Sequence, residues 1–243
     1  RPGSIGVQTS RRHLKSMCRS ESAMPAMPVM PAGPAWAGVD NMASVPGLDQ
    51  PVRLLARFTN PEIVVLQHFL SHHECDELVR LARPRLAPSE TVADDEDDLS
   101  RTSQGMFFDP AENALIRTID QRIAHCFNWP VTHGEDLQVL RYETGGRYDP
   151  HYDYFSASTP DDISGVHLHG QRVATVILYL NEPEQGGDTA FVDRDFRVTP
   201  TKGNAVFFSY LSADASSKTL HAGLPVLAGE KWIANKWLRA RPF

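Results

Sequence analysis

Before residue 136, the apolar positions follow two patterns: short continuous runs, which are typical of strands, and helical spacing. Residues 62–66 and 104–108 are short apolar runs that predict strands. Residues 71–74 read Ser-His-His-Glu, a capping-box pattern that predicts the start of a helix. A second helix of about fifteen residues is predicted after position 108. Its apolar residues recur at helical spacing: Leu115, Ile116, Ile119, Ile123 and Phe127. We expect residues 51–135 to form supporting helices and strands.

The pattern changes from Leu137 onward. The apolar segments become short and extended, and Gly, Pro, Asp and Asn separate them. Such a series is typical of antiparallel sheets and favours a double-stranded β-helix, or jelly roll, over residues 136–243. The predicted fold class is therefore α+β, mainly β, with a jelly-roll core and N-terminal supporting helices. An active pocket is expected to open between the two sheets.

Two polar or irregular segments stand apart from this pattern. Residues 1–50 are rich in Pro, Ala and Met without a clear period, which predicts a flexible leader ahead of one catalytic domain over residues 51–243. Its basic cluster at residues 11–15 is either a solvated tail or a tether to an acidic partner. Asp94 to Asp98 are five consecutive acidic residues, which predict an exposed loop. That loop is either simply solvated or attracts basic peptide.

Composition narrows the class of protein. The chain has 243 residues, 41% of them hydrophobic, so it can bury a sizeable core. Its net charge of -6 is not that of a protein with the basic surface expected for nucleic-acid binding. Its three cysteines, Cys18, Cys75 and Cys126, match neither a disulfide framework nor a thiolate metal site. No apolar run is long enough to span a membrane, and no signal-peptide core follows the basic residues near the N-terminus. These features favour a cytoplasmic protein with no membrane or nucleic-acid partner.

Candidate chemistry gathers at three positions in the second half. His151, Asp153 and His221 supply two imidazoles and one carboxylate, the ligand set of a facial-triad iron site with open coordination positions. If residues 148–154 are extended, His151 and Asp153 leave the same face of one strand. His221 must then arrive from another strand, and Lys231 supplies a cation for a dicarboxylate co-substrate. A single His-x-Asp proves little in a chain with 10 His, so the surrounding segments carry the argument.

Those segments resemble a known family. From about Arg101 to Phe243, the chain is similar to the prolyl 4-hydroxylase branch of the Fe(II)/2-oxoglutarate dioxygenases. The matching blocks, in order, are residues 138–142 leading to 151–153, 171–175 through 179–181, 186–189, 202–205, and 220–223 through 231–232. Two departures are Asp188, where the family usually has Glu, and Val192, where it usually has Pro. Neither is among the expected ligands.

The resemblance implies a ligand set and a reaction. His151, Asp153 and His221 would be the catalytic residues that bind Fe(II), and Lys231 would bind the far carboxylate of 2-oxoglutarate. O2 would be the second co-substrate, ascorbate the reductant, and succinate and CO2 the by-products. Further site residues are implied less directly. Tyr142 and Tyr179 either touch the co-substrate or belong to the core; Tyr148, Arg172 and Trp237 are expected to meet the substrate.

Three functions remain open. The leading interpretation is hydroxylation of peptidyl proline, and the alternatives are hydroxylation of a free amino acid or small metabolite and a jelly-roll binding module without turnover. Asp153 argues against a halogenase, because halide needs the coordination position that this carboxylate fills. Residues 156–170 are expected to be a variable polar loop, and the remaining histidines, including His167 and His169, are expected at the surface. The sequence leaves open the substrate protein, the carbon attacked and the oligomeric state.

Overall fold

The computed structural model describes residues 44–45, 48–89, 101–156 and 160–243. Nearly all of the expected leader and the whole acidic segment at residues 94–98 lie outside these ranges. The described chain is mainly β, with antiparallel sheets and few helices, which confirms the predicted fold class at that level.

Eight strands form the large sheet. Their spatial order is β1 (Arg53–Thr59), β2 (Glu62–Gln67), β11 (Ala205–Ser209), β7 (Arg172–Tyr179), β14 (Lys231–Arg239), β5 (Leu137–Tyr142), β4 (Gln104–Phe108) and β3 (Ala87–Pro88). The small sheet has the order β10 (Phe196–Val198), β9 (Thr189–Phe191), β12 (His221–Gly223) and β6 (Tyr148–His151). A two-stranded ribbon joins β8 (Gln185–Gly186) to β13 (Val226–Ala228). The strands predicted near residues 62–66 and at 104–108 are confirmed.

The two predicted helices are also confirmed. Helix α1 (His72–Ala82) begins with a complete capping box, in which Ser71 accepts from the backbone of Glu74 and the Glu74 side chain accepts from the backbone of Ser71. Helix α2 (Ala114–Phe127) begins at Asn113, whose side chain accepts from Ile116, and ends at a left-handed Asn128. Short 3-10 turns occupy Arg83–Arg85, Val131–His133, Val192–Arg194 and Ala215–Ser217.

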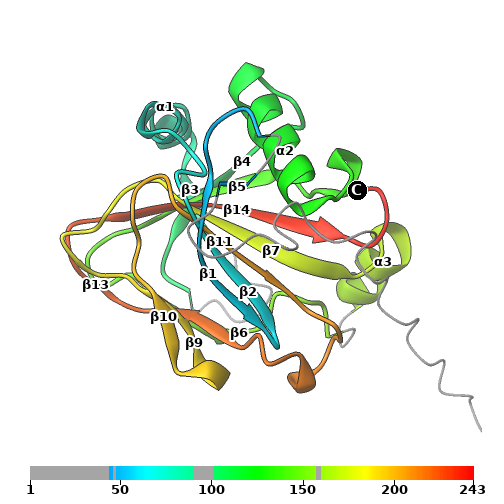
Figure 1. The fold of residues 1–243 in the computed structure, drawn as a ribbon. Helices are drawn as coiled ribbons and strands as arrows, with labels where there is room; N and C mark the ends of the chain where they lie inside the picture. The colour runs from blue at the N-terminus through cyan, green and yellow to red at the C-terminus, as the bar shows by residue number, and fades with distance from the viewer. Residues whose placement is uncertain (1–43, 46–47, 90–100, 157–159) are drawn as a thin grey trace, which may run out of the picture.

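The central strands of the large sheet, β11, β7 and β14, are buried on both faces. In β11, Ala205 and Phe207 belong to the apolar cluster that also holds residues of α1 and α2. Val206 and Phe208, which alternate with them, belong to a second cluster that joins the large sheet to the small one. Figure 1 shows α1 and α2 on one side of the large sheet and strands β6, β9 and β10 on the other. The space between the two sheets is where the ligand candidates meet.

One expectation was wrong at residues 160–169. They were expected in a variable polar loop, but they form helix α3 (Pro160–His169). Carbonyl groups at the end of a helix need partners, and here Arg239 donates to Gly165, while Arg241 donates to Val166 and His167. The C-terminal segment of the chain therefore supplies the partners for this helix, a contact with no local signal.

A second correction concerns the strand expected to reach Tyr154. Strand β6 ends at His151, and Asp153 lies in a bend. The carbonyl of Asp153 accepts from the guanidinium of Arg172 instead of from a neighbouring strand. The bend keeps Asp153 close to His151, although the two residues do not share one regular strand.

Among the described residues, no helix is both long and apolar enough to cross a bilayer.

Candidate active site

Three potential metal ligands meet on the inner face of the small sheet. Strands β6 and β12 pair antiparallel with His221 directly opposite His151. Nε2 of His151 lies 3.5 Å from one oxygen of Asp153, and Nε2 of His221 lies 3.6 Å from the other. Ligand atoms of the three residues all fall within 4.8 Å of one another, so one ion could contact all three. Two imidazoles and one carboxylate suit ferrous iron.

Both imidazoles are oriented by backbone carbonyls. Nδ1 of His151 donates to the carbonyl of Asp149 at 2.8 Å, and Nδ1 of His221 donates to that of Thr219 at 3.0 Å. Each ring therefore carries its proton on Nδ1 and keeps the Nε2 lone pair for a metal. Burial lowers the pKa of His221 to about 4, so its imidazole is neutral near pH 7. This is the protonation state that metal binding needs.

The carboxylate of Asp153 is buried and hydrogen-bonded. Thr175 donates from Oγ1 to Oδ2 of Asp153 at 2.6 Å. Burial acts to raise the pKa of Asp153, but His221, His151 and the Thr175 hydroxyl outweigh it and hold that pKa below its ordinary value. Asp153 is therefore an anion in the folded protein. It can neutralise part of the charge of a bound cation.

Lys231 lies at the start of β14, opposite Tyr142 in β5. It is 2% exposed, and its Nζ lies 5.7 Å from the centre of the Tyr142 ring. Burial lowers the pKa of Lys231 to about 8, partly opposed by the charge of Asp188. Among the described residues, no carboxylate oxygen forms an ion pair with Lys231 within 4.0 Å. A buried ammonium without an ion-pair partner fits an anionic ligand.

The two tyrosines expected near the co-substrate lie between the sheets. Tyr142 and Tyr179 are both buried and belong to the cluster shared by the two sheets. The hydroxyl of Tyr179 donates to Thr189 of β9 at 2.9 Å. Tyr142 stands beside Lys231, so it borders the space that an anion on this lysine would occupy.

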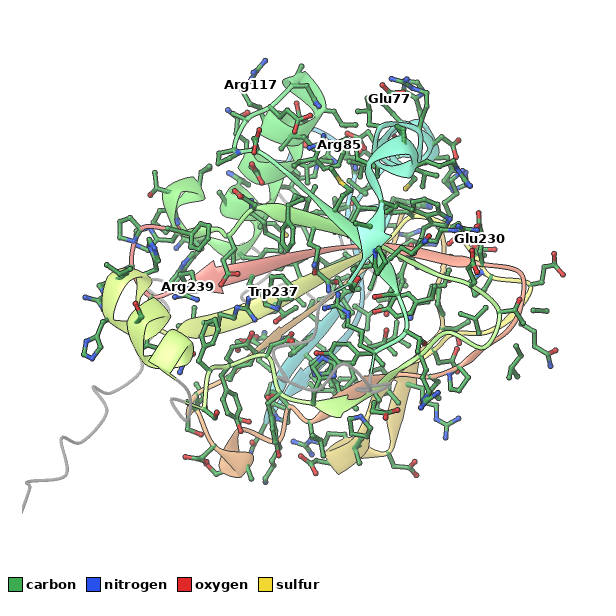
Figure 2. All side chains as sticks on the ribbon, turned by 180° about the vertical axis from the view of Figure 1, so that it is seen from behind. Glu77, Arg85, Arg117, Glu230, Trp237 and Arg239 are labelled. Atoms are coloured by element: carbon green, nitrogen blue, oxygen red, sulfur yellow. The ribbon has the colours of Figure 1, made fainter. Side chains whose placement is uncertain are left out.

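Arg172 and Trp237 form one wall at the opposite end of β14 from Lys231. The Arg172 guanidinium lies 4.0 Å from the Trp237 ring centre, and Glu135 accepts from Arg172 twice at 2.7 Å. Arg239 donates to the same carboxylate at 2.9 Å. Figure 2 shows Trp237 and Arg239 toward the α3 end of β14, with Glu230 just before its other end. Tyr148, on the small sheet, stacks on His151 with ring centres 3.6 Å apart.

Unpartnered polar atoms also mark this space. Lys231, Ile233, Asn235 and Trp237 alternate along β14, and Ile233 belongs to the cluster between the sheets. Within the described structure, Asn235 Oδ1 and Trp237 Nε1 are buried without a hydrogen-bond partner. Buried polar atoms normally have partners, so a polar ligand fits between the sheets. The residues present thus suit both a divalent metal and a dicarboxylate.

Sequence reasoning missed three residues that support the candidate site. Thr175 alternates with Ile177 and Tyr179 along one strand, so simple alternation was a usable signal that it shares the face of Tyr179. Glu135 and Tyr210 were not singled out, because their roles depend on partners far along the chain. Tyr210 contacts Thr175 from the end of β11, and Glu135 contacts Arg172 from the loop before β5.

Other candidate features lie away from the three ligands. His72, His73, His125 and His167 are exposed, as expected, and Cys75 and Cys126 are free and buried. A pocket of about 300 Å³ borders the small sheet beside Val192, Arg197 and Pro225. Its lining includes Tyr148 but none of the three potential metal ligands.

The chain is similar to known proteins in sequence and in fold. Residues 137–239 match the model of the 2OG-Fe(II) oxygenase superfamily. Prolyl 4-hydroxylase 1 of Arabidopsis thaliana is 40% identical over 204 residues, which cover 75% of this chain and 70% of that protein. Probable prolyl 4-hydroxylase 6 of Arabidopsis thaliana is 34% identical over 218 residues, covering 79% and 74%. Among solved structures, the viral collagen prolyl hydroxylase of Paramecium Bursaria Chlorella virus-1, in its 2OG complex, has 34% identity and a TM-score of 0.57, covering 73% of this chain and 95% of that one.

A mainly β fold with His, Asp and His converging on one point, together with these matches, defines an Fe(II)- and 2-oxoglutarate-dependent dioxygenase. Within that class, the chain belongs to the prolyl 4-hydroxylase family. The family expected from the sequence blocks is thereby confirmed.

Proposed function

We propose that this protein hydroxylates proline in a peptide or protein, with O2 and 2-oxoglutarate as co-substrates. The observation that carries the proposal is the convergence of His151, Asp153 and His221 in a space that also holds the buried ammonium of Lys231. Relatives named prolyl 4-hydroxylase support proline as the target. Hydroxylation of a free amino acid or small metabolite is the alternative, and a binding module without turnover is less consistent with this set of groups.

Each residue has a distinct role in the proposal. His151, Asp153 and His221 would hold the iron, and Lys231 would neutralise the far carboxylate of 2-oxoglutarate. Tyr142, which stands beside Lys231, would shield that carboxylate from water. Bound Fe(II) and 2-oxoglutarate supply the chemistry that activates O2, with succinate and CO2 released; the protein supplies position and polarity.

The substrate would pass between the wall that Arg172 and Trp237 form and the ring of Tyr148 on the small sheet. Aromatic rings and a guanidinium offer flat faces against which a proline ring can pack, together with donors for peptide carbonyls. Glu135 fixes the Arg172 guanidinium through two hydrogen bonds, so little side-chain entropy is lost when a peptide binds.

Several finer expectations remain part of the proposal. We assign the two facing sheets to a double-stranded β-helix, with residues 51–135 as supporting elements, residues 136–243 as the jelly-roll core and residues 1–50 as a leader. Ascorbate is proposed as the reductant and the cytoplasm as the location. The net charge of -6 supports the absence of a nucleic-acid partner.

The test is product analysis. Protein, Fe(II), ascorbate and 2-oxoglutarate are incubated with proline-containing peptides and with matched peptides in which alanine replaces proline. Mass spectrometry should find one added oxygen atom on proline, with equimolar succinate, and no addition to the alanine peptides. An Asp153→Ala variant is the control for background oxidation. Hydroxylation of a free amino acid alone would favour the alternative, and the absence of succinate with every substrate would refute the enzyme assignment.

A further inference from the structure

Two hydroxyl groups in series lead to the Asp153 carboxylate. Oγ1 of Thr175 lies 2.6 Å from Oδ2 of Asp153, and the hydroxyl of Tyr210 lies 2.6 Å from the same Oγ1. Thr175 is 0% exposed and Tyr210 is 3% exposed. The chain of hydrogen bonds therefore runs through the interior, from the end of β11 across β7 to a potential metal ligand.

Which group donates in each of these two hydrogen bonds follows from the single proton that each hydroxyl carries. An ionised carboxylate only accepts, so Thr175 must donate its single hydroxyl proton to Asp153. The Thr175 oxygen can then only accept from Tyr210, so the phenol must donate. Burial raises the pKa of Tyr210 well above its ordinary value, which keeps this proton in place at neutral pH.

The backbone fixes where the two hydroxyls stand. Thr175 lies inside β7, paired with Phe208 of β11 and Trp237 of β14. The amide of Tyr210 donates to the carbonyl of Val173 at 3.0 Å, which extends the β11–β7 pairing by one step beyond Ser209. Both hydroxyls are thus tied to two buried, paired strands of the large sheet.

Asp153 needs such support because of its own position. Asp153 lies in a bend after β6, so no strand holds it. The χ2 angle of an aspartate has a broad distribution, so rotamer preference does not fix the plane of its carboxylate either. A hydrogen bond from a rigid strand does fix it. Outer partners of this kind orient metal ligands and tune metal affinity.

We propose that Thr175 and Tyr210 are positioning residues that hold the Asp153 carboxylate in the orientation that metal binding needs, with Tyr210 acting only through Thr175. The inference rests on the proposed ligand set of His151, Asp153 and His221. It assigns a role in metal affinity to Tyr210, which among the described residues reaches the carboxylate only through the Thr175 hydroxyl and makes no hydrogen bond to it. A purely structural role would predict instead that changes at the two positions alter stability alone.

The experiment measures Co(II) binding to the full chain by visible absorption, with thermal unfolding of the metal-free protein measured in parallel. Thr175→Val should raise the Co(II) Kd about 10- to 100-fold, the usual effect of removing an outer partner, and should alter the absorption bands. Thr175→Ser keeps the hydroxyl and should restore most of the affinity. Tyr210→Phe should raise the Kd about 2- to 10-fold.

A double-mutant cycle isolates the connection. Adding Tyr210→Phe to Thr175→Val should change the Kd no further, because the phenol then has no hydroxyl to support. Tyr154→Phe is the matched control: it removes a nearby phenol group, whose ring centre lies 6.1 Å from that of Tyr210, and its Kd should equal that of the parent.

Each other outcome overturns one specific statement. Equal Kd values for the parent, Thr175→Val and Tyr210→Phe would overturn the inference while leaving the ligand set intact. Additive effects in the double variant would show that Tyr210 does not act through Thr175. If the parent binds Co(II) no better than His151→Ala does, the proposed ligand set itself fails. Thr175→Ser and Tyr210→Phe keep the measurement decisive if Thr175→Val does not fold.

Discussion

Replacing Lys231 by methionine should change ligand affinity and protein stability in opposite directions. The ammonium of Lys231 is buried without an ion-pair partner among the described residues, and burial lowers its pKa from 10.5 to about 8. That lowering corresponds to about 3 kcal/mol of solvation lost by the ammonium in the ligand-free fold. A carboxylate bound beside Nζ would recover this loss.

The size of the effect on 2-oxoglutarate follows from charge burial. Removing one partner of a buried charge pair costs about 3–5 kcal/mol, because the other charge stays buried and unpaired. Lys231→Met should therefore raise the Kd of 2-oxoglutarate about 100- to 4,000-fold. Methionine has a similar length and no charge, so the ligand-free variant should be about 1–3 kcal/mol more stable at pH 7 than the parent.

Calorimetric titration with 2-oxoglutarate and urea unfolding of the ligand-free protein measure the two quantities. Lys202→Met is the matched control, since Lys202 pairs with Asp76 at the surface and its loss should leave 2-oxoglutarate affinity unchanged. An unchanged Kd in Lys231→Met would refute the assignment. A ligand-free variant less stable than the parent would show that the ammonium stabilises the fold itself and would refute the argument from burial.

Four further outcomes are expected. Above about pH 8, the affinity of the parent for 2-oxoglutarate should fall by up to about tenfold for each further pH unit, because only protonated Lys231 pairs with a carboxylate. Titrations from pH 7 to 10 measure this affinity, and a flat profile would contradict the prediction. The same lowered pKa means that the buried charge destabilises the ligand-free fold below pH 8, a penalty that fades as the pH rises toward 10.5. Arg122→Met should lower the free energy of unfolding by about 2–3 kcal/mol, because the Arg122 side chain is 2% exposed and pairs with Glu74 and the half-exposed Asp49. The control Arg80→Ala removes a surface pair and should change the free energy of unfolding by less than about 0.5 kcal/mol. Urea unfolding measures both values. Removing metal with a chelator should abolish succinate release, and adding Fe(II) at about 100 times its Kd should restore it. The same Fe(II) concentration should raise the free energy of unfolding by about 2.7 kcal/mol, which a thermal melt detects. Turnover without metal would exclude the proposed chemistry.

The sequence predicted the local features of the chain, and it placed them close to the residues where the structure has them. The capping box at Ser71 and the apolar spacing of residues 115–127 involve residues within a turn or two of one another, so each segment carries its own signal. The identities of the potential ligands were also readable, because few residue types bind iron. Simple alternation along residues 175–179 also puts Thr175 and Tyr179 on the same face of their strand.

Only the tertiary structure decided how these parts meet. The register of β12 against β6 places His221 opposite His151, and nothing within either segment specifies that pairing. Arg172 was expected to face the substrate, but its guanidinium is also held by Glu135 and supports the Asp153 carbonyl. Helix α3 likewise depends on arginines at the far end of the chain. Buried polar groups must find partners wherever the fold places them, and the choice among distant partners is made by sheet register and packing rather than by neighbours in sequence.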